Sequence, residues 1–76
     1  MRVILTDEGR QLHFEKECLE SVSVFRKVND GDWKNIAKGV RTPYTDPLQI
    51  NSPATIEYKL DFANGEAESN IVKVLI

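Results

Sequence analysis

The chain has 76 residues, with ten Lys and Arg against twelve Asp and Glu, so its formal net charge is −2. This length leaves room for a single domain, residues 1–76, built around one hydrophobic core. The charge gives no electrostatic footprint for nucleic acid or an anionic membrane surface, and 41% hydrophobic content is typical of a chain that folds.

Short apolar alternations separated by turn residues run through the chain and predict β-strands. The first strand is expected at residues 2–7. It ends where Gly9 supplies the positive φ that a tight reversal requires, and residues 10–17 return with Leu12 and Phe14 on one face.

The next two strands are predicted to form a hairpin. Residues 21–28 alternate between valines on one face and Phe25 on the other. The Asp30-Gly31 pair is predicted to centre the turn, and residues 33–37 form the return strand.

The second half of the chain predicts three more strands. All three prolines fall within residues 40–53, which indicates that the strand predicted there, residues 42–45, is short and lies on an edge or between turns. Residues 55–63 give the cleanest alternation, and Asn64-Gly65 then predicts a hairpin to residues 69–76. Seven short strands without helical periodicity predict an all-β fold, a sandwich of two antiparallel sheets. Its core is expected at the inward apolar positions Val3, Leu5, Leu12, Phe14, Val22, Val24, Ile36, Ile50, Tyr58, Leu60 and Phe62.

Four motifs carry a family resemblance: VFR at residues 24–26, WKNIA at 33–37, TPYTDPL at 42–48 and NGEAES at 64–69. In this order they are similar to the second half of a fibronectin type III domain, in which a Gly-containing hairpin follows the third strand. The family usually has a tyrosine at the corner before strand F, six residues after an apolar residue. In this chain Ile50 is followed at that spacing by Ile56. The alternative is a diverged immunoglobulin-like sandwich with a different strand order.

The sequence shows no arrangement of residues typical of an active site, so we predict that the chain is not an enzyme and binds no cofactor or metal. Cys18 is the single cysteine, which excludes an internal disulfide and a Cys-based zinc site. His13 alternates to the face opposite Leu12, and the four glycines are isolated at turns. The first ten residues hold too short an apolar run for a signal peptide, and no run is long enough to insert into a membrane.

Two candidate partner-binding surfaces stand out. Phe25 points away from the valine face, and it is expected to form an exposed aromatic and cationic cluster with Arg26 and Trp33. The C-terminal strand is apolar on both faces, and only one face can pack against the core. The other face, with Ile71, Lys73 and Leu75, is predicted to bind a partner protein or a second copy of the chain.

The resemblance implies a structural spacer, an adhesive unit or a protein-binding domain, although fold alone does not determine function. We therefore predict a non-enzymatic structural or adhesive interaction module, foremost a small structural or decoration protein of a bacteriophage particle. The expected partner is a protein, either a larger assembly or a second copy that pairs at an edge strand, and the expected location is a virion or a cell surface. The alternative is a carbohydrate-associated binding module of a secreted bacterial protein.

Overall fold

The computed structural model describes residues 2–14, 22–51, 53–62 and 71–76, and these residues form seven β-strands. In chain order the strands are β1 (Arg2–Thr6), β2 (Gly9–His13), β3 (Val22–Val28), β4 (Lys34–Val40), β5 (Tyr44–Asp46), β6 (Thr55–Phe62) and β7 (Val72–Leu75). The all-β prediction is confirmed, and each predicted strand overlaps one of these. The predicted strand residues 15–17, 21, 63 and 69–70 lie outside the described part of the chain.

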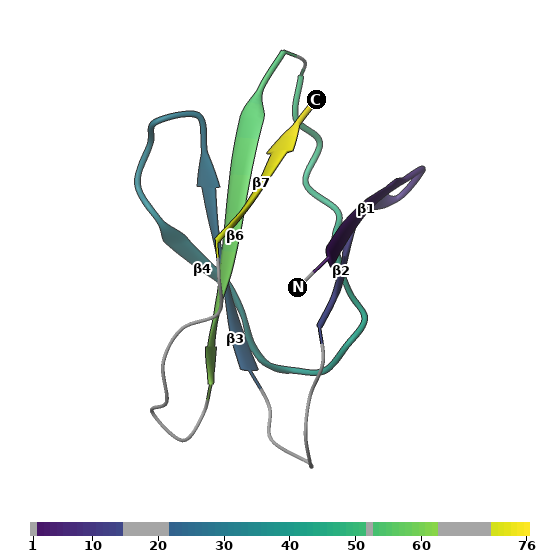
Figure 1. Cartoon of the computed structure of the whole chain (residues 1–76), viewed down its shortest axis with the longest axis vertical. Coiled ribbons are helices and arrows are strands. Elements are labelled where there is room, and N and C mark those ends of the chain that lie inside the picture. Colours follow the sequence, from purple (N-terminus) through teal and green to yellow (C-terminus); the bar gives the residue numbers. More distant parts are fainter. Residues whose placement is uncertain (1, 15–21, 52, 63–70) are drawn as a thin grey trace.

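The strands form two antiparallel sheets that face each other as a sandwich (Figure 1). The three-stranded sheet has the order β1-β2-β5, and the four-stranded sheet has the order β4-β3-β6-β7. The longest pairing joins β3 to β6, from Val22 opposite Phe62 to Val28 opposite Ile56. The two strands with the strongest alternation in the sequence therefore form the middle of the larger sheet.

Two turns show how local sequence sets the strand connections. Gly9 has a φ of 137°, and a Cβ there would collide with the backbone oxygen of Asp46, so only glycine fits. The turn after β3 is centred on Asn29-Asp30 instead of the predicted Asp30-Gly31, because Asn29 itself takes the positive φ of 53°. Its backbone N–H and side-chain oxygen both bond Thr55, which fixes this position.

The core lies between the sheets, and most of its predicted members are confirmed. Six of them are buried, namely Leu12, Phe14, Val22, Val24, Tyr58 and Leu60. Val3, Ile36 and Ile50 are half-buried against this cluster, and Ile56 and Ala54 are buried as well. The side chain of Phe62 lies outside the described part.

The prediction for Leu5 is wrong, because 58% of this residue is exposed. It lies near the end of β1, the edge strand of the smaller sheet. The tip of the β1–β2 hairpin points away from the four-stranded sheet (Figure 1), so Leu5 has no opposite layer to pack against. Correct alternation does not bury a residue that the facing sheet does not reach.

The leucine pair Leu60 and Leu5 gives a direct test of this core. Leu60 is only 1% exposed, so Leu60→Ala is expected to lower the free energy of unfolding by about 2–5 kcal/mol. The same substitution at exposed Leu5 is expected to cost about 0.5 kcal/mol or less. Urea unfolding of both variants measures the difference, and equal losses would contradict the described packing.

Candidate functional site

Four polar side chains from four strands meet between the sheets. Arg10 (β2) and Asp46 (β5) come from the smaller sheet, whereas Arg26 (β3) and Tyr58 (β6) come from the larger one. Arg26 Nη1 donates to both carboxylate oxygens of Asp46, at 2.7 and 2.9 Å, and the Tyr58 hydroxyl donates to Oδ2 at 2.6 Å. Arg10 Nε in turn donates to the Tyr58 oxygen at 2.7 Å. These four residues, which we call the inter-sheet cluster, join the two sheets through one carboxylate.

The same cluster fixes the chain that leaves β5. Arg10 Nη2 donates to the backbone oxygens of Asp46 and Leu48, at 3.3 and 2.7 Å, and approaches the Asp46 carboxylate at 3.3 Å. The Leu48 amide donates back to Asp46 Oδ1 at 3.3 Å. Residues 46–48 are therefore held from both their side-chain and their backbone atoms.

The environment keeps Asp46 ionised. Burial is the largest single influence and opposes the charge, since only 2% of the side chain is exposed. Hydrogen bonds from Tyr58, Arg26 and the Leu48 amide, with the positive charge of Arg26, outweigh burial and lower the pKa of Asp46 below its ordinary value. Burial and the hydrogen bond to Asp46 raise the pKa of Tyr58, so its hydroxyl keeps the proton that it donates.

The outer face of the four-stranded sheet carries a cluster of rings and lysines. Lys59 Nζ lies 5.5 Å from the ring centre of Phe25 and 4.7 Å from that of Trp33, and Lys27 Nζ lies 5.7 Å from the Trp33 ring. Lys27 also pairs with Glu57 at 3.5 Å. We call Phe25, Trp33, Lys27 and Lys59 the aromatic–lysine cluster, and its contacts are cation–π interactions.

The exposed side of β7 belongs to this same face. Glu57 of β6 lies opposite Lys27 on β3 and opposite Lys73 on β7, so the three form one row across the sheet. Leu75 is 72% exposed and Ile71 is 54% exposed. Within the described part of the chain, β7 pairs only with β6 and forms the edge of the sheet (Figure 1).

The structure therefore brings five of the six predicted partner-binding residues onto one face: Phe25, Trp33, Ile71, Lys73 and Leu75. Arg26 is not among them. Strand alternation turns it inward, where it is 14% exposed and paired with Asp46. The position that sequence reasoning gave to Arg26 beside Trp33 is taken by Lys59 and Lys27.

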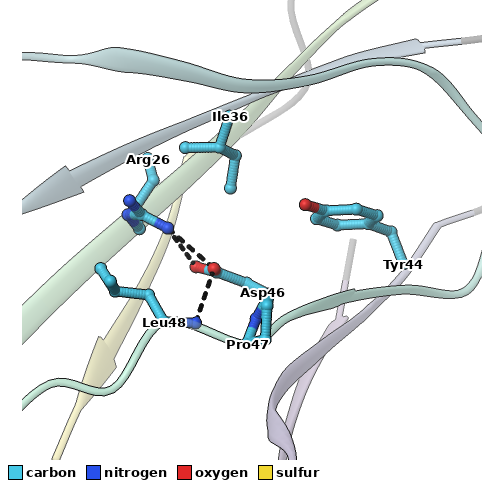
Figure 2. A pocket seen from close by; sticks show the side chains of 6 residues that line it. All are labelled: Arg26, Ile36, Tyr44, Asp46, Pro47 and Leu48. Carbon is cyan, nitrogen blue, oxygen red and sulfur yellow. Dashed lines mark hydrogen bonds and ion pairs between the residues drawn. The ribbon is translucent and has the colours of Figure 1, made fainter.

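An open pocket of about 420 Å³ lies between β4 and β5, the neighbouring edges of the two sheets (Figure 2). It is lined by Arg26, Ile36, Tyr44, Asp46, Pro47 and Leu48. Figure 2 shows the ion pair of Arg26 and Asp46 on one side and the Tyr44 hydroxyl directed toward it from the other. Burial and the charge of Asp46 raise the pKa of Tyr44, so it stands there as a neutral hydroxyl.

Sequence reasoning missed Asp46, Arg10 and the pocket. One usable signal was present, because Arg10 alternates with Leu12 and Arg26 alternates with Val24, which places two arginines on inner faces. Inward arginines require a buried acid. Which acid this is follows only from the pairing of β2 with β5, which sets Arg10 opposite Asp46.

The other residues considered as catalytic or metal-binding candidates form no such site in the described part of the chain. His13 Nε2 lies 2.7 Å from Gln11 Oε1, a contact between neighbours on one strand. Among the described residues, no group of three or more His, Cys, Asp or Glu side chains is placed to hold a metal ion. Cys18 lies outside those residues. The same part of the chain contains no helix long and apolar enough to cross a membrane.

Comparison with known proteins gives no match to this chain, whether against family models, curated proteins or solved structures.

The inter-sheet cluster makes stability depend on acid in a defined direction. Because the pKa of Asp46 is lower in the folded chain than its ordinary value of 3.8, its stabilisation is complete above that value. It is lost as the pH falls from there through the folded-state pKa. Urea unfolding from about pH 7 to about pH 2 should show stability decreasing below about pH 4.

Asp46→Asn tests the same cluster by substitution. It leaves two buried arginines without their anion, so it is expected to lower the free energy of unfolding by about 3–5 kcal/mol at neutral pH. Tyr58→Phe keeps the carboxylate, removes one donor and one acceptor, and is expected to cost about 1–3 kcal/mol. If Asp46→Asn were as stable as wild type and lost stability with acid to the same extent, the cluster would not hold the sheets together.

Proposed function

We propose that this chain is a non-enzymatic interaction module of fibronectin type III-like architecture, which docks onto a larger protein assembly. Support for the architecture comes from β4, which pairs with β3 as the return strand of a hairpin. In constant-type immunoglobulin domains the fourth strand pairs in the other sheet instead. One of the four motifs that carry the resemblance, residues 33–37, is the segment that enters β4.

The observation that carries the docking proposal is the outer face of β3, β6 and β7. Exposed Leu75 and Ile71 lie on a sheet edge, and a second strand can add to such an edge through its backbone groups. The aromatic–lysine cluster lies on the same face, on β3 and β6 and the residue before β4. A sheet face with aromatic anchors and an edge strand that, among the described residues, pairs on one side only fits a protein partner better than a small molecule.

Charge favours an acidic partner. On this face the three lysines Lys27, Lys59 and Lys73 outnumber the two acids Glu57 and Asp61 by one, although the whole chain has a net charge of −2. Such a local excess of positive charge steers association with a negatively charged surface and weakens as salt is added. Among the uses that the family resemblance implies, decoration of a bacteriophage particle is the one that we propose.

The alternative, a carbohydrate-associated module, would need the faces of Phe25 and Trp33 as a stacking platform. Lysine ammonium groups lie over both rings, at 5.5 and 4.7 Å from the ring centres for Lys59. A sugar ring would have to displace Lys59 from both. The rings therefore support a protein interface more than a sugar site.

Leu75→Lys tests the docking edge. The residue is exposed, so the variant is expected to keep the wild-type melting temperature. Attachment is expected to weaken at least about tenfold, because losing the apolar contact of Leu75 and blocking strand addition with a charged side chain outweigh the attraction of one more lysine to an acidic partner. The assay for attachment depends on the genes beside the one that encodes this chain. If they are capsid or tail genes, attachment is measured by co-sedimenting the chain with particles of that phage that lack it. Sedimentation velocity of the chain alone measures pairing between copies.

Leu5→Lys is the matched control, since it makes the same change at an exposed leucine of the other sheet. It is expected to attach as wild type does. Equal attachment of wild type and the Leu75 variant, with a strictly monomeric wild type, would remove β7 as the interface. Neighbouring glycoside hydrolase genes would favour the carbohydrate alternative.

A further inference from the structure

The inter-sheet cluster, which forms one wall of the pocket between β4 and β5 through Arg26 and Asp46, carries more positive than negative charge. The inter-sheet cluster has two guanidinium groups, Arg10 and Arg26, but only one carboxylate, Asp46. Tyr58 is neutral and adds no negative charge. One positive charge is thus left over in a place where water reaches little of either arginine, and such a charge favours an anion beside it.

The hydrogen-bonding groups of the cluster that are still free belong to Arg26. Asp46 already receives donors from Arg26, Tyr58 and the Leu48 amide, and Arg10 bonds Tyr58 and two backbone oxygens. Arg26 uses only Nη1. Its Nε and Nη2 groups have no acceptor among the described residues, and Arg26 lines the pocket.

The remaining walls define the rest of the ligand. Ile36, Pro47 and Leu48 present apolar surface, and the Tyr44 hydroxyl is directed into the same space (Figure 2). At about 420 Å³ the pocket lies within the range of small-ligand sites, which are mostly apolar with a few polar groups that orient the ligand.

We propose that this pocket binds an organic carboxylate that carries an apolar group, with the carboxylate on Arg26 and the apolar group against Ile36, Pro47 and Leu48. The net charge of +1 on the inter-sheet cluster matches a singly charged carboxylate better than a phosphate. The carboxylate belongs either to a free organic acid or to an acidic residue beside an apolar one in a partner protein.

The test uses N-acetyl-L-leucine, with N-acetyl-L-leucinamide as the uncharged control of the same shape. Two NMR signals of the ¹⁵N-labelled chain report on the site, the Arg26 Nε–H and the Leu48 backbone N–H. The acid is expected to shift both signals in a saturable way, and the amide is expected to bind about tenfold more weakly or worse. Equal binding of acid and amide, or no saturable shift at either signal, overturns the proposal.

Leu48→Glu and Leu48→Gln separate charge from shape without touching the inter-sheet cluster, which uses only the backbone of Leu48. The glutamate places a carboxylate at the pocket and should weaken N-acetyl-L-leucine binding about tenfold more than the glutamine does. Equal weakening by both variants contradicts a role for Arg26.

A blocked peptide, acetyl-Ala-Leu-Glu-Leu-Ala-amide, distinguishes the two sources. Tighter binding of the peptide than of N-acetyl-L-leucine assigns the site to a protein partner, whereas weaker or equal binding assigns it to a free acid. Both results support carboxylate recognition. Failure of N-acetyl-L-leucine to bind overturns the proposal whatever the peptide does. Loss of this site leaves the β7 docking test unaffected, because Leu75 lies on the opposite edge of the four-stranded sheet.

Discussion

The Asp46 carboxylate is the constraint on which the rest of this sandwich depends. A chain of 76 residues buries few large side chains, and a purely apolar contact between two open sheets has many nearly equivalent arrangements. Asp46 removes that freedom, because its oxygens accept hydrogen bonds from β3 and β6 while its backbone pairs with β2. A buried ion pair adds little net stability compared with well-packed apolar residues. Its contribution here is geometric: it fixes β5 against the larger sheet and fixes the segment that follows as a pocket wall.

The register that turns Arg26 inward also determines what the surface presents. Because successive side chains of a strand point to opposite faces, Arg26 toward Asp46 places Phe25 and Lys27 outward. The β3–β6 pairing then sets Lys59 beside Phe25, and the β6–β7 pairing brings Lys73 into the row of Lys27 and Glu57. A register slip of one residue would break the inter-sheet cluster and bury the aromatic–lysine cluster at the same time. Core and outer face are therefore two results of one alignment.

Local patterns made the strands and most of the core predictable, because alternation reports directly on which face a residue takes. They failed where the answer depended on segments that are distant in the sequence. Leu5 alternates correctly but projects beyond the facing layer. The turn after β3 is centred on Asn29-Asp30 and not on Asp30-Gly31, and Thr55, which is distant in the sequence, bonds Asn29 there. The inter-sheet cluster was beyond prediction for the same reason, since Arg10 and Asp46 become neighbours only through the pairing of β2 with β5. The grouping of Phe25 with Arg26 failed on simple alternation, which the sequence already contained.

The two edges of the four-stranded sheet are built differently, and the difference indicates which one is open to a partner. The exposed positions of β4 are Lys34, Asn35, Lys38 and Gly39, all polar or without a side chain. Charged and polar residues at an edge strand discourage another strand from adding to it. On β7 and the residue before it, the exposed positions are Ile71, Lys73 and Leu75, so that one charge stands between two large apolar side chains. An apolar, exposed edge is a liability in a chain that works alone. On this sheet it is confined to one side, next to the aromatic–lysine cluster, where the protein partner that we propose would cover both.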